Sequence, residues 1–315
     1  MRSRTIGVAL FLVATFALPA SAQLNTQHIK GAVGLKGGSV PPPHWYVVAP
    51  LVYTYNTDTV RDRDGNKIPV NADITVALFG TGVTRITTKK FLGGNYGFSA
   101  VVAGVNNRLQ AAEIEFDPGG GLTDMVVQPV ILGWSFKRAD VMASYTMYLP
   151  TGRYNRGGSD NLGFGMWGHE PAVGTTVYLN ASRQFHAATV ASVTFQSNKE
   201  DSDTHVGTAM NLEGGVGADF LKGGLTTGLV YYTSFKLQSD RIDVVPDIPG
   251  TIVGGKNKVF AFGPEVSLAI AAKGTIFAFL KVNYQWEVFA KTNTQGNALI
   301  LTLSLPVKPI KLPAP

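Results

Sequence analysis

Cysteine is absent from this 315-residue chain. Its absence excludes a disulfide scaffold, a thiolate metal site and a cysteine nucleophile. Charge is scarce as well, because Asp, Glu, Lys and Arg make up only 15% of the residues. Soluble domains carry roughly 25%, so an ordinary soluble enzyme is disfavoured. A disordered chain is excluded too, since hydrophobic residues reach 45%.

Long apolar runs are missing beyond residue 22, where no stretch of about 18 apolar residues occurs, so we expect no transmembrane helix. The chain is nevertheless too apolar and too poor in charge for a typical secreted soluble protein. A closed β-barrel is the other structure that crosses a membrane, because it pairs every backbone group with a neighbouring strand.

The N-terminus has the three parts of a secretory signal peptide. Arg2 and Arg4 form a basic start, residues 6–18 are apolar, and Ala20-Ser21-Ala22 is a small-residue cleavage site. We expect cleavage near Ala22. A membrane-anchoring helix is disfavoured because the apolar run is too short.

Alternation with a period of two is clearest near the C-terminus. Apolar residues from Ile276 to Val288 share one parity, while Lys281, Asn283, Gln285 and Glu287 share the other. A strand with one face in lipid and one in water has this pattern, whereas a helix would mix the two sets. Glu213 and Glu265 fall on the polar parity of two further strands.

Turn signals divide the chain into twelve candidate strands. They are 45–57, 72–87, 95–115, 122–136, 141–150, 170–181, 186–197, 205–219, 225–238, 258–271, 275–290 and 298–307. Short connections alternate with longer polar ones, which is typical of an outer-membrane barrel with periplasmic turns and extracellular loops. Aromatic residues near strand ends are candidates for two interfacial girdles: Trp45, Tyr96, Trp134, Tyr145, Tyr148, Phe235 and Trp286.

We therefore predict an all-β fold, a transmembrane antiparallel up-and-down β-barrel of about 12 strands. The expected division is a signal peptide at 1–22, a Gly/Pro-rich leader at 23–43, the barrel at 44–308 and a tail at 309–315. A soluble β-sandwich or barrel is the rival, because it also alternates. It would place charge on its exposed face, whereas the polar face here carries mostly Gly, Ser, Thr and Asn.

Three motifs suggest chemistry, and each has a simpler interpretation. Residues 163–168 read G-x-G-x-x-G, but Pro171 follows in an all-β context and no helix is expected after them. Residues 62–66 resemble the start of a calcium loop without its later ligands, so a hairpin tip is favoured. His169-Glu170 lacks the second histidine of a zinc motif. We expect no catalytic residues, no metal and no cofactor.

The leader ends in three prolines, Pro41 to Pro43, and contains no strand pattern. Prolines favour an extended conformation outside a sheet. Two interpretations remain open. The leader is either a free periplasmic tail or a plug folded back into the barrel mouth, with Lys30 or Lys36 paired to an inward glutamate.

One stretch carries a family resemblance. It runs from Leu122-Thr123-Asp124-Met125 through Leu132-Gly133-Trp134 to Tyr148-Leu149-Pro150-Thr151-Gly152-Arg153-Tyr154. It continues with Asn161-Leu162-Gly163-Phe164-Gly165 and Trp167-Gly168-His169-Glu170-Pro171. This run resembles the bacterial outer-membrane proteins named for the meta-pathway of phenol degradation. The family-motif loop residues are Pro150, Thr151, Gly152, Tyr154, Asn161, Gly163, Trp167 and Pro171.

The resemblance implies an outer-membrane channel for passive uptake of small hydrophobic or aromatic compounds. We expect the pore to be lined by Glu213, Glu265, Lys281, Asn283, Gln285 and Glu287. The expected partners are membrane lipid and lipopolysaccharide, a small hydrophobic solute and the outer-membrane assembly machinery, with no nucleic acid. A structural or adhesive barrel acting through its loops, and a barrel that modifies lipids, are the alternatives.

Overall fold

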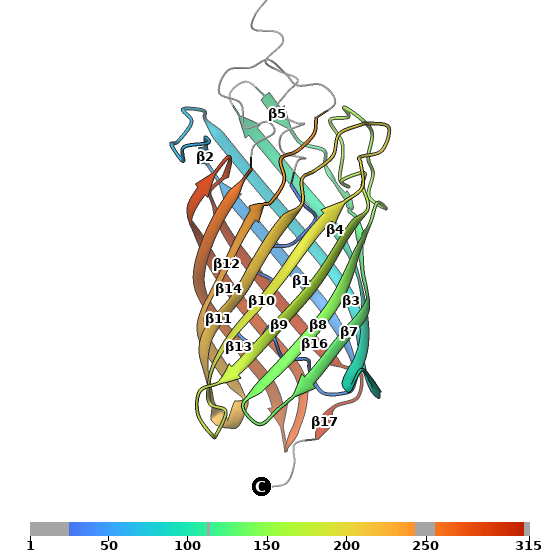
Figure 1. Cartoon of the computed structure of the whole chain (residues 1–315), viewed down its shortest axis with the longest axis vertical. Coiled ribbons are helices and arrows are strands. Elements are labelled where there is room, and N and C mark those ends of the chain that lie inside the picture. Colours follow the sequence, from blue (N-terminus) through green and yellow to red (C-terminus); the bar gives the residue numbers. More distant parts are fainter. Residues whose placement is uncertain (1–24, 112–113, 243–255, 312–315) are drawn as a thin grey trace, which may run out of the picture.

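The computed structural model describes residues 25–111, 114–242 and 256–311, and twelve long strands within them form a closed antiparallel barrel (Figure 1). The strands are β1 (Trp45–Thr57), β3 (Ala72–Phe91), β4 (Gly94–Ala111), β7 (Met125–Ser135), β8 (Ala139–Leu149), β9 (Gly168–Tyr178), β10 (Phe185–Gln196), β11 (Ala209–Phe220), β12 (Leu225–Lys236), β13 (Lys258–Ala272), β14 (Thr275–Lys291) and β16 (Asn297–Pro306). Each pairs with the next along the chain, and β16 pairs with β1, which closes the barrel. The predicted fold class is confirmed.

Short elements decorate the two rims. At the long-loop rim β2 (Val60–Arg61) pairs with β15 (Asn293–Thr294), and both β5 (Ile114–Phe116) and β6 (Gly120–Leu122) pair with β4. At the short-turn rim β17 (Ile310–Lys311) pairs with β14, so part of the expected tail joins the sheet. The short 3₁₀ turn η2 (Leu221–Gly223) links β11 to β12, and the described residues include no helix that is long and apolar enough to cross a membrane.

Tight turns explain the short rim. Leu92 and Gly93 between β3 and β4 both have positive φ angles, of 49° and 82°, and Lys273 and Gly274 repeat this geometry between β13 and β14. Two consecutive residues with positive φ form the hairpin turn that matches the twist of antiparallel strands. These turns lie at the bottom of Figure 1, and the long loops lie at the top.

The outer wall of the barrel is apolar. Large hydrophobic side chains are exposed there on many strands, including Phe79, Val102, Val173, Val216, Leu229, Phe262, Val266 and Trp286. A soluble barrel would bury such a surface, so this band is the lipid-facing side of a membrane barrel.

Bulges reverse the facing of side chains at both ends of β14. The register slips between Phe260 and Ala261 and again between Ile270 and Ala271 of the partner strand. A bulge adds one residue to one strand, so the side chains beyond it change face. Phe289 and Phe277 are therefore exposed although they share the parity of inward Asn283, which is why the phenylalanines break the alternation.

Two expectations from the sequence need correction. Tyr148 does not belong to an aromatic girdle, because it is buried in the lumen against Glu170. The strand expected at 205–219 begins only at Ala209, and Val206 is buried in a loop cluster with Met166. The predicted signal peptide at 1–22 lies outside the described residues.

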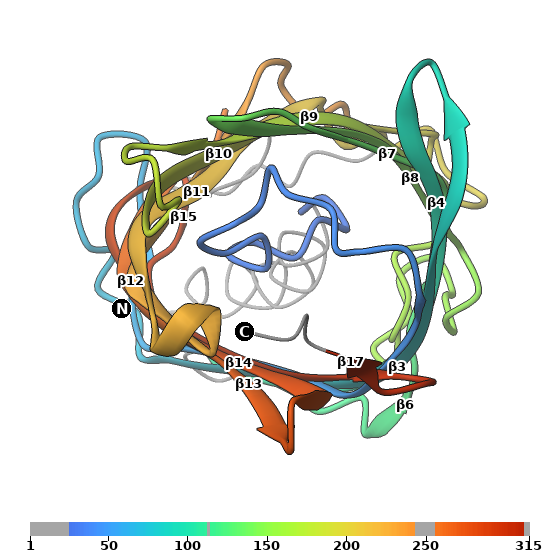
Figure 2. The ribbon, with the colours of Figure 1, turned by 90° about the horizontal axis from the view of Figure 1, so that it is seen from below.

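The described part of the leader, residues 25–43, lies inside the barrel. Figure 2 shows it in blue within the ring of strands. It meets the start of β1 at the short-turn rim and approaches the long loops at Gln27, whose side-chain amide donates a 2.8 Å hydrogen bond to the carbonyl of Met166. The leader therefore runs the height of the lumen.

Candidate functional site: the barrel lumen

A histidine of the leader is held between two inward glutamates. The Nδ1 atom of His28 lies 2.9 Å from Oε2 of Glu170 on β9, and its Nε2 atom lies 2.8 Å from Oε1 of Glu213 on β11. An ionised carboxylate only accepts hydrogen bonds, so with Glu170 and Glu213 both ionised the two ring nitrogens carry protons and His28 is an imidazolium. All three side chains are less than 10% exposed. We call His28, Glu170 and Glu213 the histidine clamp.

Other groups complete the hydrogen bonding of Glu170. The Tyr148 hydroxyl donates to it at 3.0 Å and the Thr194 hydroxyl at 2.9 Å. A buried carboxylate is costly unless its oxygens are bonded. Tyr148 on β8, Thr194 on β10 and His28 therefore supply the hydrogen bonds that the buried Glu170 carboxylate on β9 needs.

Backbone N–H groups of the leader donate to two glutamates. The amides of Gly31 and Val33 bind Glu213 at 2.9 and 3.1 Å, and that of Leu35 binds Glu265 at 3.0 Å. The leader has no strand neighbour, so carboxylates take the place of sheet partners for its backbone.

Two leader positions require glycine. Gly31 and Gly34 have φ angles of 82° and 80°, a region that other residues rarely adopt. A Cβ atom would also lie 2.3 Å from Nε2 of Gln285 at the first position and 2.5 Å from Oε2 of Glu265 at the second. The glycines thus allow the backbone to approach the wall closely.

The inner face of β14 binds the leader from the other side. Lys281 donates to the carbonyl of Ala32 at 2.7 Å, while Asn283 and Gln285 donate to that of Gly31 at 3.2 and 3.1 Å. Glu287 instead accepts hydrogen bonds from Tyr55, Tyr232 and the amide of Gly296.

The residues expected to line the pore therefore all face the lumen. Five of them contact the leader, and the sixth, Glu287, contacts the barrel wall. Their role in a pore stays a prediction. No leader lysine forms the expected ion pair with a glutamate among the described residues. His28 contacts Glu170 and Glu213 instead, and Lys36 forms an ion pair with Asp219 at 2.6 Å.

Small residues of the wall make room for the leader near the short-turn rim. Leu35 is 1% exposed, and its Cδ2 atom would lie only 2.9–3.1 Å from Cβ atoms added at Gly215, Gly217 or Gly228. Lower down, the Ser39 hydroxyl donates to Asp140 at 2.8 Å. Apolar packing and polar contacts thus hold the leader along its length.

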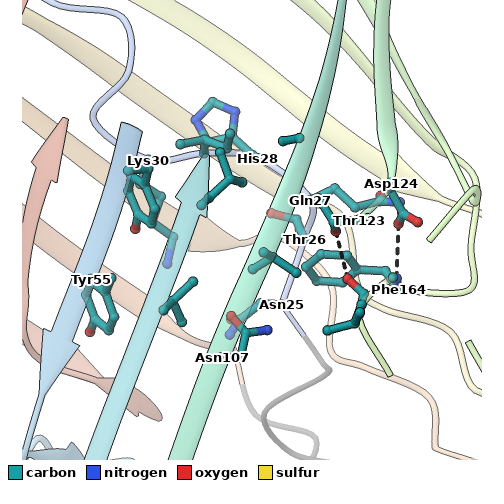
Figure 3. Close-up of a pocket in the computed structure, with 18 of the residues that line it drawn as sticks. Asn25, Thr26, Gln27, His28, Lys30, Tyr55, Asn107, Thr123, Asp124 and Phe164 are labelled. Carbon is teal, nitrogen blue, oxygen red and sulfur yellow. Dashed lines mark hydrogen bonds between the residues drawn. The ribbon is translucent and has the colours of Figure 1, made fainter. Parts of the chain in front are cut away.

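The opposite half of the lumen contains a cavity of about 330 Å³. Figure 3 shows Lys30 and Tyr55 on one side of it and Asp124 and Phe164 on the other. Its wall on β1, β3 and β4 is mostly apolar, although Arg108 and Asn107 also line it. The apolar side chains there are Leu51, Ile74, Val76, Leu78, Val101 and Val105. One side of the lumen therefore holds the leader through charged and polar contacts, and the other side contains a mostly apolar cavity that leader residues 25–30 also border.

The family-motif loop covers the cavity on the long-loop side. Asp124 accepts the amides of Gly152 and Phe164, both at 3.0 Å, and the Thr123 hydroxyl donates to the carbonyl of Leu162 at 2.7 Å. Gly152 and Gly163 lie so close that a Cβ on one would come within 3 Å of the backbone of the other. Leu162, Gly163 and Phe164 all line the cavity.

The remaining motif residues support this loop, with one exception. The Thr151 hydroxyl accepts the amide of Met125 at 2.9 Å, Asn161 bonds to the backbone of Asn155, and the Trp167 amide donates to Ser197. Pro150 follows directly on β8. Pro171 is the exception, because it lies within β9 with its side chain exposed on the outer face.

Tyr154 and Lys199 form the outer edge of the loop. The Tyr154 ring packs on Gly165, and the Lys199 ammonium lies 5.2 Å from the ring centroid. Burial lowers the pKa of Lys199 to about 8, against the opposing effect of Asp124 and Asp240. Burial also raises the pKa of Asp124, which the amides of Phe164 and Gly152 lower in turn.

Sequence reasoning missed the clamp, the role of Asp124 and the apolar wall. His169-Glu170 shows what was overlooked: Glu170 points inward, whereas His169 bonds to Tyr145 and stacks on Phe195. The opposite facing of two adjacent strand residues was the available signal. The sequence carried no such signal for the apolar wall of the cavity, because β1 has apolar residues on both of its faces.

Residues 57–303 match the protein family described as MetA-pathway of phenol degradation. The chain belongs to this family. The resemblance seen in the sequence is thereby confirmed over most of the barrel.

Solved structures similar to this member of the phenol-degradation family are outer-membrane barrels. The COG4313 outer membrane channel from Pseudomonas putida F1 is 12% identical and superposes with a TM-score of 0.69 over 89% of this chain and 99% of that one. At this identity the likeness shows the fold alone. The β domain of the Bordetella autotransporter BrkA, 12% identical, covers 84% of this chain and 99% of that one at a TM-score of 0.44, which carries no argument. No curated protein matches.

Proposed function

We propose that this protein is an outer-membrane channel for passive entry of small hydrophobic or aromatic compounds, and that it performs no catalysis. The observation that carries the proposal is the apolar cavity inside the barrel. At about 330 Å³ it falls within the range of small-molecule sites, roughly 300–1,000 Å³.

The position of the cavity supports this function. It lies within the lumen, where a solute moving between the two rims would pass, and the family-motif loop and the leader border it. An apolar wall lowers the free energy of an apolar solute, because water is displaced from both surfaces. We propose that the leader acts as the plug of this passage.

The alternative functions gain less support. An adhesive or structural barrel acting through its loops has no need of an apolar internal cavity. A barrel enzyme that modifies lipids needs a nucleophile beside a base. In the described part of the chain, no hydrogen bond of a histidine goes to a serine hydroxyl.

Filling the cavity tests the proposal. Ala103 lines it, whereas the preceding residue on β4, Val102, is 44% exposed on the outer wall. Ala103→Trp should slow the uptake of radiolabelled toluene by intact cells, and Val102→Trp should leave it unchanged. Uptake that is the same in cells with and without the protein would refute the channel function.

A further inference from the structure

A leader lysine reaches the cavity without a hydrogen-bond partner. Lys30 is half-buried, and its side chain is part of the lining of the cavity described above (Figure 3). No described residue accepts a hydrogen bond from its ammonium or lies within ion-pair distance of it. An ammonium carries three donors and is unfavourable in a site shielded from water unless something accepts from them.

The neighbouring carboxylates are already engaged. Glu213 is bound by His28 and by the amides of Gly31 and Val33. Glu287 accepts from Tyr55 at 2.7 Å, from Tyr232 at 2.8 Å and from the Gly296 amide at 2.7 Å. Both influence Lys30 through space, but neither contacts it. The donors of Lys30 thus remain available to a ligand.

Two more polar atoms of this cavity, the side-chain oxygens of Gln27 and Asn107, are buried without a partner among the described residues. The Tyr53 hydroxyl also lines the cavity, and no described residue forms a hydrogen bond with it. Tyr53 lies two residues before Tyr55 on β1, so both point inward. A few unpaired polar groups on an otherwise apolar wall are typical of a site that orients a small ligand.

We propose that the cavity binds a small monocarboxylate with a compact apolar body, such as an aromatic acid. Its carboxylate accepts hydrogen bonds from Lys30 and Tyr53, and its body lies against Ile74, Val76 and Val105. The bound carboxylate supplies the acceptor that the Lys30 ammonium lacks, and a charge-assisted hydrogen bond of this kind is stronger than a neutral one. This inference rests on the proposed function, since it names the solute class for the same cavity.

Ligands that share one body and differ in the head group test the inference. We would measure binding of benzoate, benzyl alcohol and toluene to the full mature protein, refolded in detergent, by titration calorimetry. Benzoate should bind about tenfold or more tighter than toluene, as one charge-assisted hydrogen bond allows. Lys30→Met keeps the length of the side chain and should remove this preference while toluene still binds. Tyr53→Phe should reduce it partly.

Lys36→Met is the matched control, because Lys36 lies in the same leader but pairs with Asp219 away from the cavity. It should leave the preference for benzoate intact, and heat-modifiable migration on gels verifies that every variant is folded. Equal binding of benzoate and toluene, or an unchanged preference in Lys30→Met, would overturn the inference and leave the proposed function standing. If none of the three compounds binds, the proposed function fails as well.

Discussion

His28 is the leader side chain that contacts two buried carboxylates of the barrel wall. Its two ring nitrogens contact carboxylates on β9 and β11, so a single residue ties the leader to separate strands. A buried ion pair contributes little to the free energy of folding when it is compared with apolar residues of similar volume in the same place. Removing one partner is strongly destabilising, however, because the other charges remain buried and unpaired.

His28→Ala should therefore weaken docking of the leader by about 3–5 kcal/mol, the usual cost of breaking a buried pair. The expected readout is faster proteolysis of the leader and a noisier, larger single-channel current. His205→Ala is the control, since His205 lies in a loop and bonds to Asn198. A variant with an unchanged proteolysis rate would show that the clamp does not hold the leader.

At the scale of elements, the leader is the part of the chain that fills the charged and polar side of the lumen. Its contacts extend from Gln27 to Ser39 and include the backbone as well as side chains. The barrel strands pair with one another without it. The leader should thus be removable while the barrel stays folded.

Deleting residues 28–43 should raise single-channel conductance in planar bilayers. It should also make the pore cation-selective, because Glu170, Glu213 and Glu265, which the leader now binds, would then face water. Heat-modifiable migration serves as the folding control. A well-folded truncation with the conductance of the undeleted protein would mean that the leader does not obstruct the pore.

At the scale of the whole molecule, the two faces of the wall experience different solvents. Val282 on β14 pairs with outward-facing Val266 on β13, and the next residue, Asn283, is buried against the leader. Substitutions at these neighbouring positions should therefore have unrelated effects.

Val282→Arg should lower the free energy of unfolding in lipid by about 2–4 kcal/mol if the site is near the midplane. Val307→Arg is a suitable comparison, because Val307 is exposed beyond the end of β16 at the short-turn rim. There a charge should cost about 0–1 kcal/mol. Urea titration of both refolded variants measures the difference, and equal costs would mean that Val282 does not face lipid.

The alternation of apolar and polar residues predicted the strands well wherever one face meets lipid and the other meets the polar lumen. The strand expected at 275–290 is Thr275–Lys291 in the structure. Its ends could not be assigned a face, since no residue type marks the bulges opposite β13. The clamp was beyond reach for another reason. His28 meets partners 142 and 185 residues away, and only closure of the barrel brings them together.

The leader also has a consequence for the order of assembly. It is continuous with β1, the strand that joins β16 at the seam, and His44, the residue between them, bonds to the carbonyl of Lys308 beyond β16. The chain that fills the lumen is thus attached to the strand edge that completes the barrel. Docking of the leader and closure of the seam therefore involve the same end of β1.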